Sequence, residues 1–227
     1  MKDEKCVLLT GPNMGGKSTI LRQVGLLSIL AHYGSPVPAE EMRLSVIDRI
    51  FTRLGASDRL LAGESTFMVE MAETSSILKN GTEESLLLLD ELGRGTATHD
   101  GTAIAQAVLE DLSGKNIRCL FSTHYHSLSQ TPPPGCITQH MQCHVEKDDN
   151  NIEQVTFLYT LANGSAPKSH GFHAARTAGV PEEIVKNAQI VARDLEILHR
   201  GLKFLKLLKT NELEDVVDCL TGISLGN

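Results

Sequence analysis

The sequence predicts an α/β fold in which helices flank a mainly parallel sheet, and three observations support this. Short apolar runs alternate with helix-periodic segments as far as about residue 130. A glycine-rich stretch, Gly11–Ser18, joins the first apolar run to the first helical segment. The run Leu86–Leu89 is apolar without interruption, which is typical of a strand buried on both faces. Such alternation favours parallel strands connected through helices.

The first strand and helix follow from the residues on either side of the glycine stretch. Cys6–Thr10 is an aliphatic and β-branched run that Gly11 and Pro12 end, so we expect a buried strand there. From Lys17 onward, apolar residues recur at helical spacing until Gly34 supplies a stop signal. The glycine stretch therefore connects a strand to a helix.

The same patterns predict the elements that follow. Ser45–Gly55 reads as a strand or strand pair, and Ser65–Leu78 as a helix with a serine cap. Ser85–Leu92 is an apolar strand that ends in two acids, and Gly101–Leu112 has helical spacing. Ile117–Leu128 is expected to be another strand that runs out into polar residues.

The rhythm changes after residue 130. Ile137–Leu161 reads as two antiparallel strands around an acidic, asparagine-rich hairpin. A short helix is expected over Gly171–Ala178, a turn at Gly179–Val180, and a long helix that begins at Pro181. Together these last elements predict a C-terminal helix-turn-helix.

Composition limits the classes of protein that the chain can belong to. A net charge of −7 over 227 residues disfavours nonspecific attraction to nucleic acid, so any DNA contact would use a local patch or another region. The five cysteines are odd in number and irregularly spaced, which argues against a secreted disulfide framework. The first residues do not read as a signal peptide, and no apolar run is long enough to cross a bilayer. We therefore expect an intracellular protein, with nucleus and cytoplasm equally open.

Gly11–Ser18 fits the phosphate-loop pattern G-x-x-x-x-G-K-[ST] between a strand and a helix. Glycines let the backbone curl so that amide groups surround phosphate oxygens, and the helix N-terminus adds partial positive charge. Lys17 could reach the β- and γ-phosphates, and the Ser18 hydroxyl could bind Mg²⁺. The alternative, a chance glycine turn, is disfavoured because strand, loop and helix stand in the required order.

Two acids and a histidine complete the candidate site. The apolar strand that ends at Asp90 and Glu91 is expected to lie beside the phosphate-loop strand and to deliver both carboxylates to its C-terminal edge. Asp90 suits Mg²⁺, and Glu91 suits proton abstraction from the water that attacks the γ-phosphate. Glu91 could instead be a solvated strand-end carboxylate. His124 could sense the γ-phosphate or be a local hydrogen-bonding group.

Four stretches, "TGPNMGGKST", "STFMVEM", "DELGRGTATHDG" and "STHYHSL", resemble the C-terminal ATPase domain of the MutS family of DNA mismatch repair proteins. The resemblance is nearly continuous over Cys6–Leu198. The variants "GESTF" and "TATHDG" are most similar to the large mismatch-contacting subunit of the eukaryotic heterodimer. The resemblance implies an ABC-type P-loop ATPase domain over residues 1–161, a helix-turn-helix dimerisation region over 162–200 and a weakly ordered tail over 201–227.

The resemblance also implies roles for individual residues. Asp90 matches the family's magnesium-binding acid, and Ser18 matches the hydroxyl that binds the same ion. Glu91 matches the catalytic base, and His124 matches the family's switch histidine. Ser65 matches the residue that reaches the γ-phosphate of the opposite subunit, although a plain helix cap is the alternative. Asp100 matches a loop that crosses between the two sites. The residues expected around the triphosphate are Pro12, Asn13, Met14, Gly15, Gly16, Lys17, Ser18 and Thr19.

The expected function is therefore an ATP-hydrolysing dimerisation module of a nuclear mismatch repair protein, with ATP and Mg²⁺ at a composite site that a second MutS-family subunit completes. Only ten residues precede Gly11, so we expect a truncated module without independent mismatch recognition and with weak nucleotide affinity and turnover. One alternative is another ABC-type ATPase of a transporter or of chromosome maintenance, but no LSGGQ-like signature occurs. A second is a non-catalytic nucleotide-binding dimerisation module, which the intact Lys17, Asp90 and Glu91 disfavour.

Overall fold

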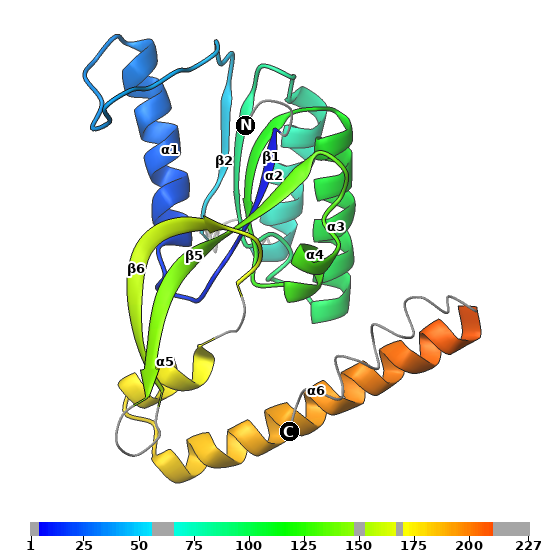
Figure 1. Ribbon diagram of the computed structural model, residues 1–227. Helices are drawn as coiled ribbons and strands as arrows, with labels where there is room; N and C mark the ends of the chain where they lie inside the picture. Colours follow the sequence, from blue (N-terminus) through cyan, green and yellow to red (C-terminus); the bar gives the residue numbers. More distant parts are fainter. Residues whose placement is uncertain (1–4, 56–65, 148–152, 167–169, 211–227) are drawn as a thin grey trace. The chain divides into compact units, whose positions relative to one another are not determined.

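The computed structural model divides the chain into two compact units, Met1–His170 and Gly171–Asn227. Figure 1 shows the course of the chain through both units. The structure describes residues 5–55, 66–147, 153–166 and 170–210. In this described part, no helix combines the length and the apolar character needed to span a bilayer.

The first unit contains one six-stranded sheet, which confirms the predicted α/β class. The strand order is β2-β3-β4-β1-β5-β6. The first five strands in this order pair in parallel, and only the β5–β6 pair is antiparallel. The strands are β1 (Cys6–Thr10), β2 (Ile50–Arg53), β3 (Leu86–Asp90), β4 (Arg118–Ser122), β5 (Cys136–Lys147) and β6 (Glu153–Asn163).

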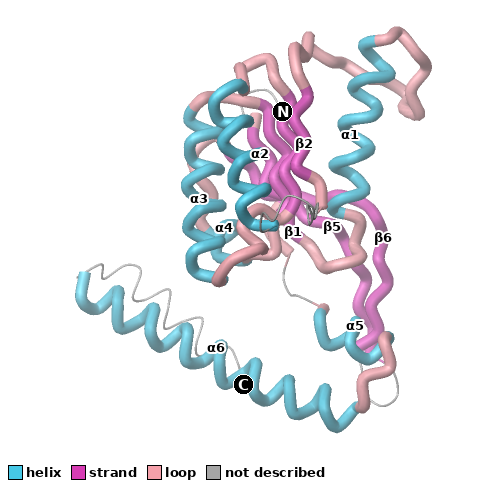
Figure 2. Tube along the Cα trace, turned by 180° about the vertical axis from the view of Figure 1, so that it is seen from behind, coloured by secondary structure: helices cyan, strands magenta, loops and turns pink. Residues whose placement is uncertain are grey.

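Helices cover both faces of this sheet. Figure 1 and the reverse view in Figure 2 place α1 on one face, and α2, α3 and α4 on the other. Each connection between consecutive parallel strands therefore includes a helix that lies on one face of the sheet, as parallel strands require. The helices of this unit are α1 (Lys17–His32), α2 (Thr66–Asn80), α3 (Thr98–Gly114) and α4 (His126–Gln130).

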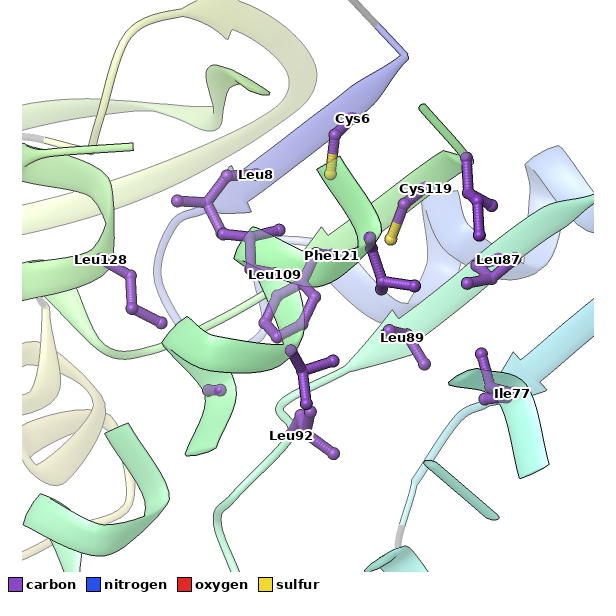
Figure 3. Packing of buried hydrophobic residues seen from close by; sticks show 14 of the residues in the cluster. Cys6, Leu8, Ile77, Leu87, Leu89, Leu92, Leu109, Cys119, Phe121 and Leu128 are labelled. Carbon is purple, nitrogen blue, oxygen red and sulfur yellow. The ribbon is translucent and has the colours of Figure 1, made fainter. Parts of the chain in front are cut away.

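The uninterrupted apolar run of β3 supplies two separate cores. Leu87 and Leu89 belong to the cluster that α2, α3 and α4 complete, and Figure 3 shows their packing around Phe121 of β4. Leu86 and Leu88 face the other way and pack in the cluster that contains Leu21 of α1. Successive side chains of a strand point to opposite faces, so a strand buried on both sides needs an apolar residue at every position.

Two expectations about the strands are wrong. Strand β3 does not lie beside β1, because β4 lies between them; a sequence pattern shows that strands are buried but not which strands pair. The predicted strand Ile117–Leu128 ends at Ser122, where the Tyr125 amide donates to Thr123 Oγ1 over 3.0 Å and the chain turns into α4.

The segment before β2 is also shorter than predicted. Of Ser45–Gly55, only Ile50–Arg53 forms a strand. The Ile47 amide donates to His32 Nε2 over 3.1 Å, and the Val46 carbonyl accepts from Arg118 Nη2 over 2.9 Å. These backbone groups pair with side chains, so they do not extend the ladder.

The described part of the second unit contains α5 (Gly171–Thr177) and α6 (Glu182–Thr210). The Arg176 guanidinium joins them by donating to both oxygens of Glu182, over 2.8 and 3.0 Å. These hydrogen bonds hold the pKa of the Glu182 carboxyl below its usual range. Helix α6 continues past residue 201, the expected start of the tail, while residues 211–227 lie outside the described part. Several apolar side chains of α6 are exposed: Ile184, Ile190, Val191, Leu195, Ile197 and Leu198.

The two-sided burial of β3 predicts a large cost for truncating one of its side chains. Leu89→Ala should lower the free energy of unfolding by about 2–5 kcal/mol, because Leu89 is fully buried and its loss leaves a cavity. Leu26→Ala is the matched control; Leu26 is 63% exposed, so the change should stay within about 0.5 kcal/mol. Urea unfolding followed by circular dichroism measures both, and equal losses would contradict the burial assignment.

Candidate functional site

A cavity of about 770 Å³ lies where β1, β2 and β3 end. The residues that line it follow the carboxyl ends of these strands or face them from helices and from β6. In parallel sheets this edge is where ligands bind. The lining residues are Pro12, Asn13, Met14, Gly16, Lys17, Ser18, Thr19, Arg22, Arg53, Gly55, Thr66, Glu70, Asp90, Glu91, Arg94, Gly95 and Tyr159.

The loop between β1 and α1 is a tight backbone curl. Met14 and Gly16 have positive φ values of 68° and 97°, and the Gly15 amide donates to the Pro12 carbonyl over 3.2 Å. A Cβ atom on Gly16 would lie 3.2 Å from the ring of Tyr159, so glycine fits this position both by conformation and by space. No side chain caps α1 at Gly16. The backbone amides of its first turn therefore lie at the cavity without a hydrogen bond from a capping side chain.

Lys17 is buried beside this loop, with 5% of its surface exposed. Its ammonium group donates to the Gly11 and Pro12 carbonyls over 2.9 and 3.1 Å. Burial lowers the pKa of Lys17, while the nearby carboxylates of Glu91 and Asp90 act in the opposite direction. The distance from Lys17 Nζ to Glu91 Oε1 is 3.9 Å.

The two acids at the end of β3 are held by different partners. The Ser122 hydroxyl of the neighbouring strand donates to Asp90 Oδ1. Glu91 Oε2 accepts a hydrogen bond from Arg94 Nη1 over 2.6 Å. Glu91 therefore lies between two cations, Lys17 and Arg94, while the Asp90 carboxylate is oriented by a neutral hydroxyl.

Backbone strain is concentrated around the cavity. Among the described residues, four that are not glycine have a positive φ, and Met14, Glu91 and Tyr159 of these line the cavity. A residue of this kind costs of order 1–3 kcal/mol, so it persists only where its surroundings impose the conformation. Strain of this kind gathers at binding and catalytic sites.

Most of the site residues expected from the sequence meet at this cavity, and a few do not. Gly15 lies buried within the loop and is not part of the lining. His124 and Asp100 are exposed and also outside the lining; the His124 ring lies with its centroid 4.1 Å from that of Tyr125. Ser65 lies outside the described residues. Those that do line the cavity are Pro12, Asn13, Met14, Gly16, Lys17, Ser18, Thr19, Asp90 and Glu91.

Five lining residues with charged or aromatic side chains were not anticipated from the sequence. Arg53 is 6% exposed, and its Nε lies 3.2 Å from Glu73 Oε2. The only signal in the sequence was an arginine near the end of the predicted strand Ser45–Gly55. Tyr159 is 65% exposed on β6, where nothing in the strand pattern marks it. The others are Arg22, Glu70 and Arg94.

The loop after β3 is held by side chains from α2 and from the start of α4. The Gly93 amide donates to Glu70 Oε1 over 2.9 Å, and the Tyr125 hydroxyl donates to the Gly93 carbonyl over 2.8 Å. A Cβ atom on Gly101, in the first turns of α3, would lie 2.2 Å from Gly93 O. The two backbones are thus in direct contact, which only glycine permits at Gly101.

Comparison with known proteins places this arrangement in a family. A family model described as MutS domain V matches residues 7–196. The DNA mismatch repair protein Msh6 of Gallus gallus is 55% identical over 212 residues, which cover 91% of this chain and 16% of that protein. Human Msh6 is 54% identical over 207 residues, covering 88% and 15%. The DNA mismatch repair protein MutS of Clostridium perfringens is 47% identical over 198 residues, covering 86% and 21%.

The chain thus spans about a sixth of the length of the two Msh6 relatives. These findings correct the description drawn from the motifs, a C-terminal ATPase domain most like one eukaryotic subunit. The matched model is described as domain V, and bacterial MutS proteins are similar to the chain along with eukaryotic Msh6. Because the model covers residues 7–196, the chain belongs to the MutS family and contains its domain V.

Proposed function

We propose that this chain is the ATP-binding and ATP-hydrolysing module of a DNA mismatch repair protein, built on an ABC-type P-loop. The supporting observation is that Lys17, Ser18, Asp90 and Glu91 line one cavity at the carboxyl edge of the sheet. A nest of amides, an ammonium group and two carboxylates is the combination that a metal-bound triphosphate requires. The relatives to which the chain is similar are named DNA mismatch repair proteins.

Binding would draw on groups already directed at the cavity. The amides of the loop and of the first turn of α1 would surround the phosphates. The Lys17 ammonium would exchange its bonds to the Gly11 and Pro12 carbonyls for bonds to phosphate oxygens. Tyr159 offers an exposed aromatic face at the cavity wall, suited to packing against a nucleotide base.

The donor set also fits Mg²⁺. The Ser18 hydroxyl and the Asp90 carboxylate are hard oxygen donors in the same lining, and Ser122 orients Asp90. Within the described ranges no group of three or more His, Cys, Asp or Glu side chains could hold a metal. Mg²⁺ suits such a site because it keeps several waters and takes phosphate oxygens as ligands. When bound, it would neutralise charge on the phosphates.

Glu91 is the proposed catalytic base. Its carboxylate would accept a proton from the water that attacks the γ-phosphorus, and ADP and phosphate would leave. Lys17 would stabilise charge on the transferring phosphate. His124 is proposed to respond to the γ-phosphate from the end of β4, a role that requires it to approach the cavity from its present exposed position.

We further propose that a second MutS-family subunit completes the site in the nucleus. Ser65 and Asp100 are the residues proposed to act on the partner's nucleotide. The exposed apolar residues of α6 support a dimerisation role for α5 and α6 as a helix-turn-helix. Mismatched DNA would be contacted through other regions of the longer protein. With the family shown, the remaining alternative is a non-catalytic nucleotide-binding dimerisation module.

Replacement of the proposed base separates these two functions. Glu91→Gln should lower ATP turnover by about a hundredfold to ten-thousandfold and leave nucleotide binding intact, because the amide cannot take the proton. Phosphate release is measured in the chain alone and mixed with a second MutS-family subunit. Glu110→Gln is the matched control, since Glu110 is exposed on α3 and bonds only to Gln106 among the hydrogen bonds described. Equal turnover in wild type and Glu91→Gln would favour the non-catalytic module.

Nucleotide affinity should depend on pH through Lys17. The pKa of Lys17 is lowered from 10.5, so the ammonium loses its proton at a lower pH than an exposed lysine would. Affinity for metal-free ADP should therefore fall as the pH rises, starting below the ordinary lysine range. Fluorescence titration with a labelled nucleotide measures this. Lys115→Ala, on an exposed lysine paired with Asp111, should keep the wild-type profile, whereas Lys17→Ala should bind weakly at every pH.

Nucleotide should also promote association. If two subunits share the triphosphate, ATP with Mg²⁺ stabilises the associated form by mass action. Sedimentation velocity of the Glu91→Gln variant, which would retain ATP, should show a larger species with ATP than with ADP. Leu195→Glu on the exposed face of α6 should weaken that species. A sedimentation profile indifferent to nucleotide and to Leu195→Glu would contradict the composite site.

A further inference from the structure

Glu91 occupies a backbone conformation that side chains rarely adopt, with φ of 53°. Something must therefore hold the loop after β3 in place. On the N-terminal side, the Glu91 amide donates to the Ser122 carbonyl over 3.1 Å. On the C-terminal side, Leu92 is fully buried in the core that Figure 3 shows. These contacts fix the chain up to Leu92 but not the peptide groups that follow.

Gly93 is held at both of its hydrogen-bonding groups by side chains from other elements. Its amide donates to Glu70 Oε1 of α2, and its carbonyl accepts from the Tyr125 hydroxyl at the start of α4. Both side chains are buried, with 4% and 6% of their surfaces exposed. Buried polar groups at these distances are costly to leave without their partners, so the two bonds define one position for Gly93.

The protonation of Tyr125 favours its role as a donor. Burial, together with the nearby Glu70 and Glu91 carboxylates, raises the pKa of the Tyr125 phenol. A phenol is protonated at neutral pH even without this shift, and the shift moves its titration further above neutrality, so the hydroxyl can donate a hydrogen bond to the Gly93 carbonyl. Glu70, in turn, lines the same cavity as Glu91.

We infer that Glu70 and Tyr125 are positioning residues for Glu91. By hydrogen bonding to the amide and the carbonyl of Gly93, they hold the proposed base in its left-handed conformation, facing the cavity. This inference rests on the proposed function, because it concerns the carboxylate assigned to proton transfer. Neither side chain needs to touch the nucleotide. Their loss would displace the base while the phosphate loop stayed intact.

The experiment compares Glu70→Gln, Glu70→Ala and Tyr125→Phe. Glu70→Gln keeps an oxygen that can accept from the Gly93 amide, so it should retain most of the turnover. Glu70→Ala and Tyr125→Phe should each lower kcat by about tenfold to a hundredfold with KM unchanged, the loss expected when one buried hydrogen bond stops holding a catalytic group. Glu110→Gln and Tyr33→Phe, both on exposed residues, serve as matched controls.

Three outcomes would overturn the inference. One is an effect of Glu70→Ala and Tyr125→Phe on KM alone. Another is a loss in Glu70→Gln as large as in Glu70→Ala, since that would indicate a need for charge and not for an acceptor. The third is unchanged kcat in Tyr125→Phe.

A second readout separates this inference from the proposed function. Hydrogen exchange of the peptide that covers residues 90–95, followed by mass spectrometry, should speed up in Glu70→Ala and Tyr125→Phe but not in Glu70→Gln or the controls. If the wild-type chain shows no turnover, hydrolysis fails as a function. Faster exchange in these two variants would then still support the inference that Glu70 and Tyr125 hold the loop at Gly93, and unchanged exchange would overturn that inference.

Discussion

Parallel pairing of β1, β4 and β3 is the constraint on which the rest of the structure depends. Parallel strands place their carboxyl ends at a common edge, so the loops after β1 and β3 meet although β4 separates the two strands. Burial on both faces removes polar residues from these strands. The polar side chains that the chain offers near the sheet therefore gather at its edge, around the cavity.

Both cationic and anionic side chains line the cavity. Each carboxylate has a donor of its own within the protein: Glu70 has the Gly93 amide, Asp90 the Ser122 hydroxyl, and Glu91 the Arg94 guanidinium. Against these three carboxylates the lining holds four cationic side chains, Lys17, Arg22, Arg53 and Arg94. Such an arrangement favours an anionic ligand while keeping acidic side chains within reach of it.

The sequence was sufficient for the features that depend on local pattern. The run Leu86–Leu89 predicted a buried strand, and the glycine loop at Gly11–Ser18 predicted the start of a helix. The two acids after the run were predicted to lie at the carboxyl edge of the sheet. Strand order was not predictable, because which strand lies next to β1 depends on how the whole sheet packs and not on the residues of β1 alone. The positions of Glu70 and Tyr159 at the cavity were also not predictable, since each depends on contacts between elements far apart in the sequence. Ser65, which the sequence predicted as a site residue, lies outside the described residues.

The contact between Gly93 and Gly101 has a mechanical consequence. With no side chain between them, the backbone after β3 touches the first turns of α3, and neither can shift toward the other. A shift of the loop toward α3 (Thr98–Gly114) is therefore blocked unless the first turns of the helix move with it.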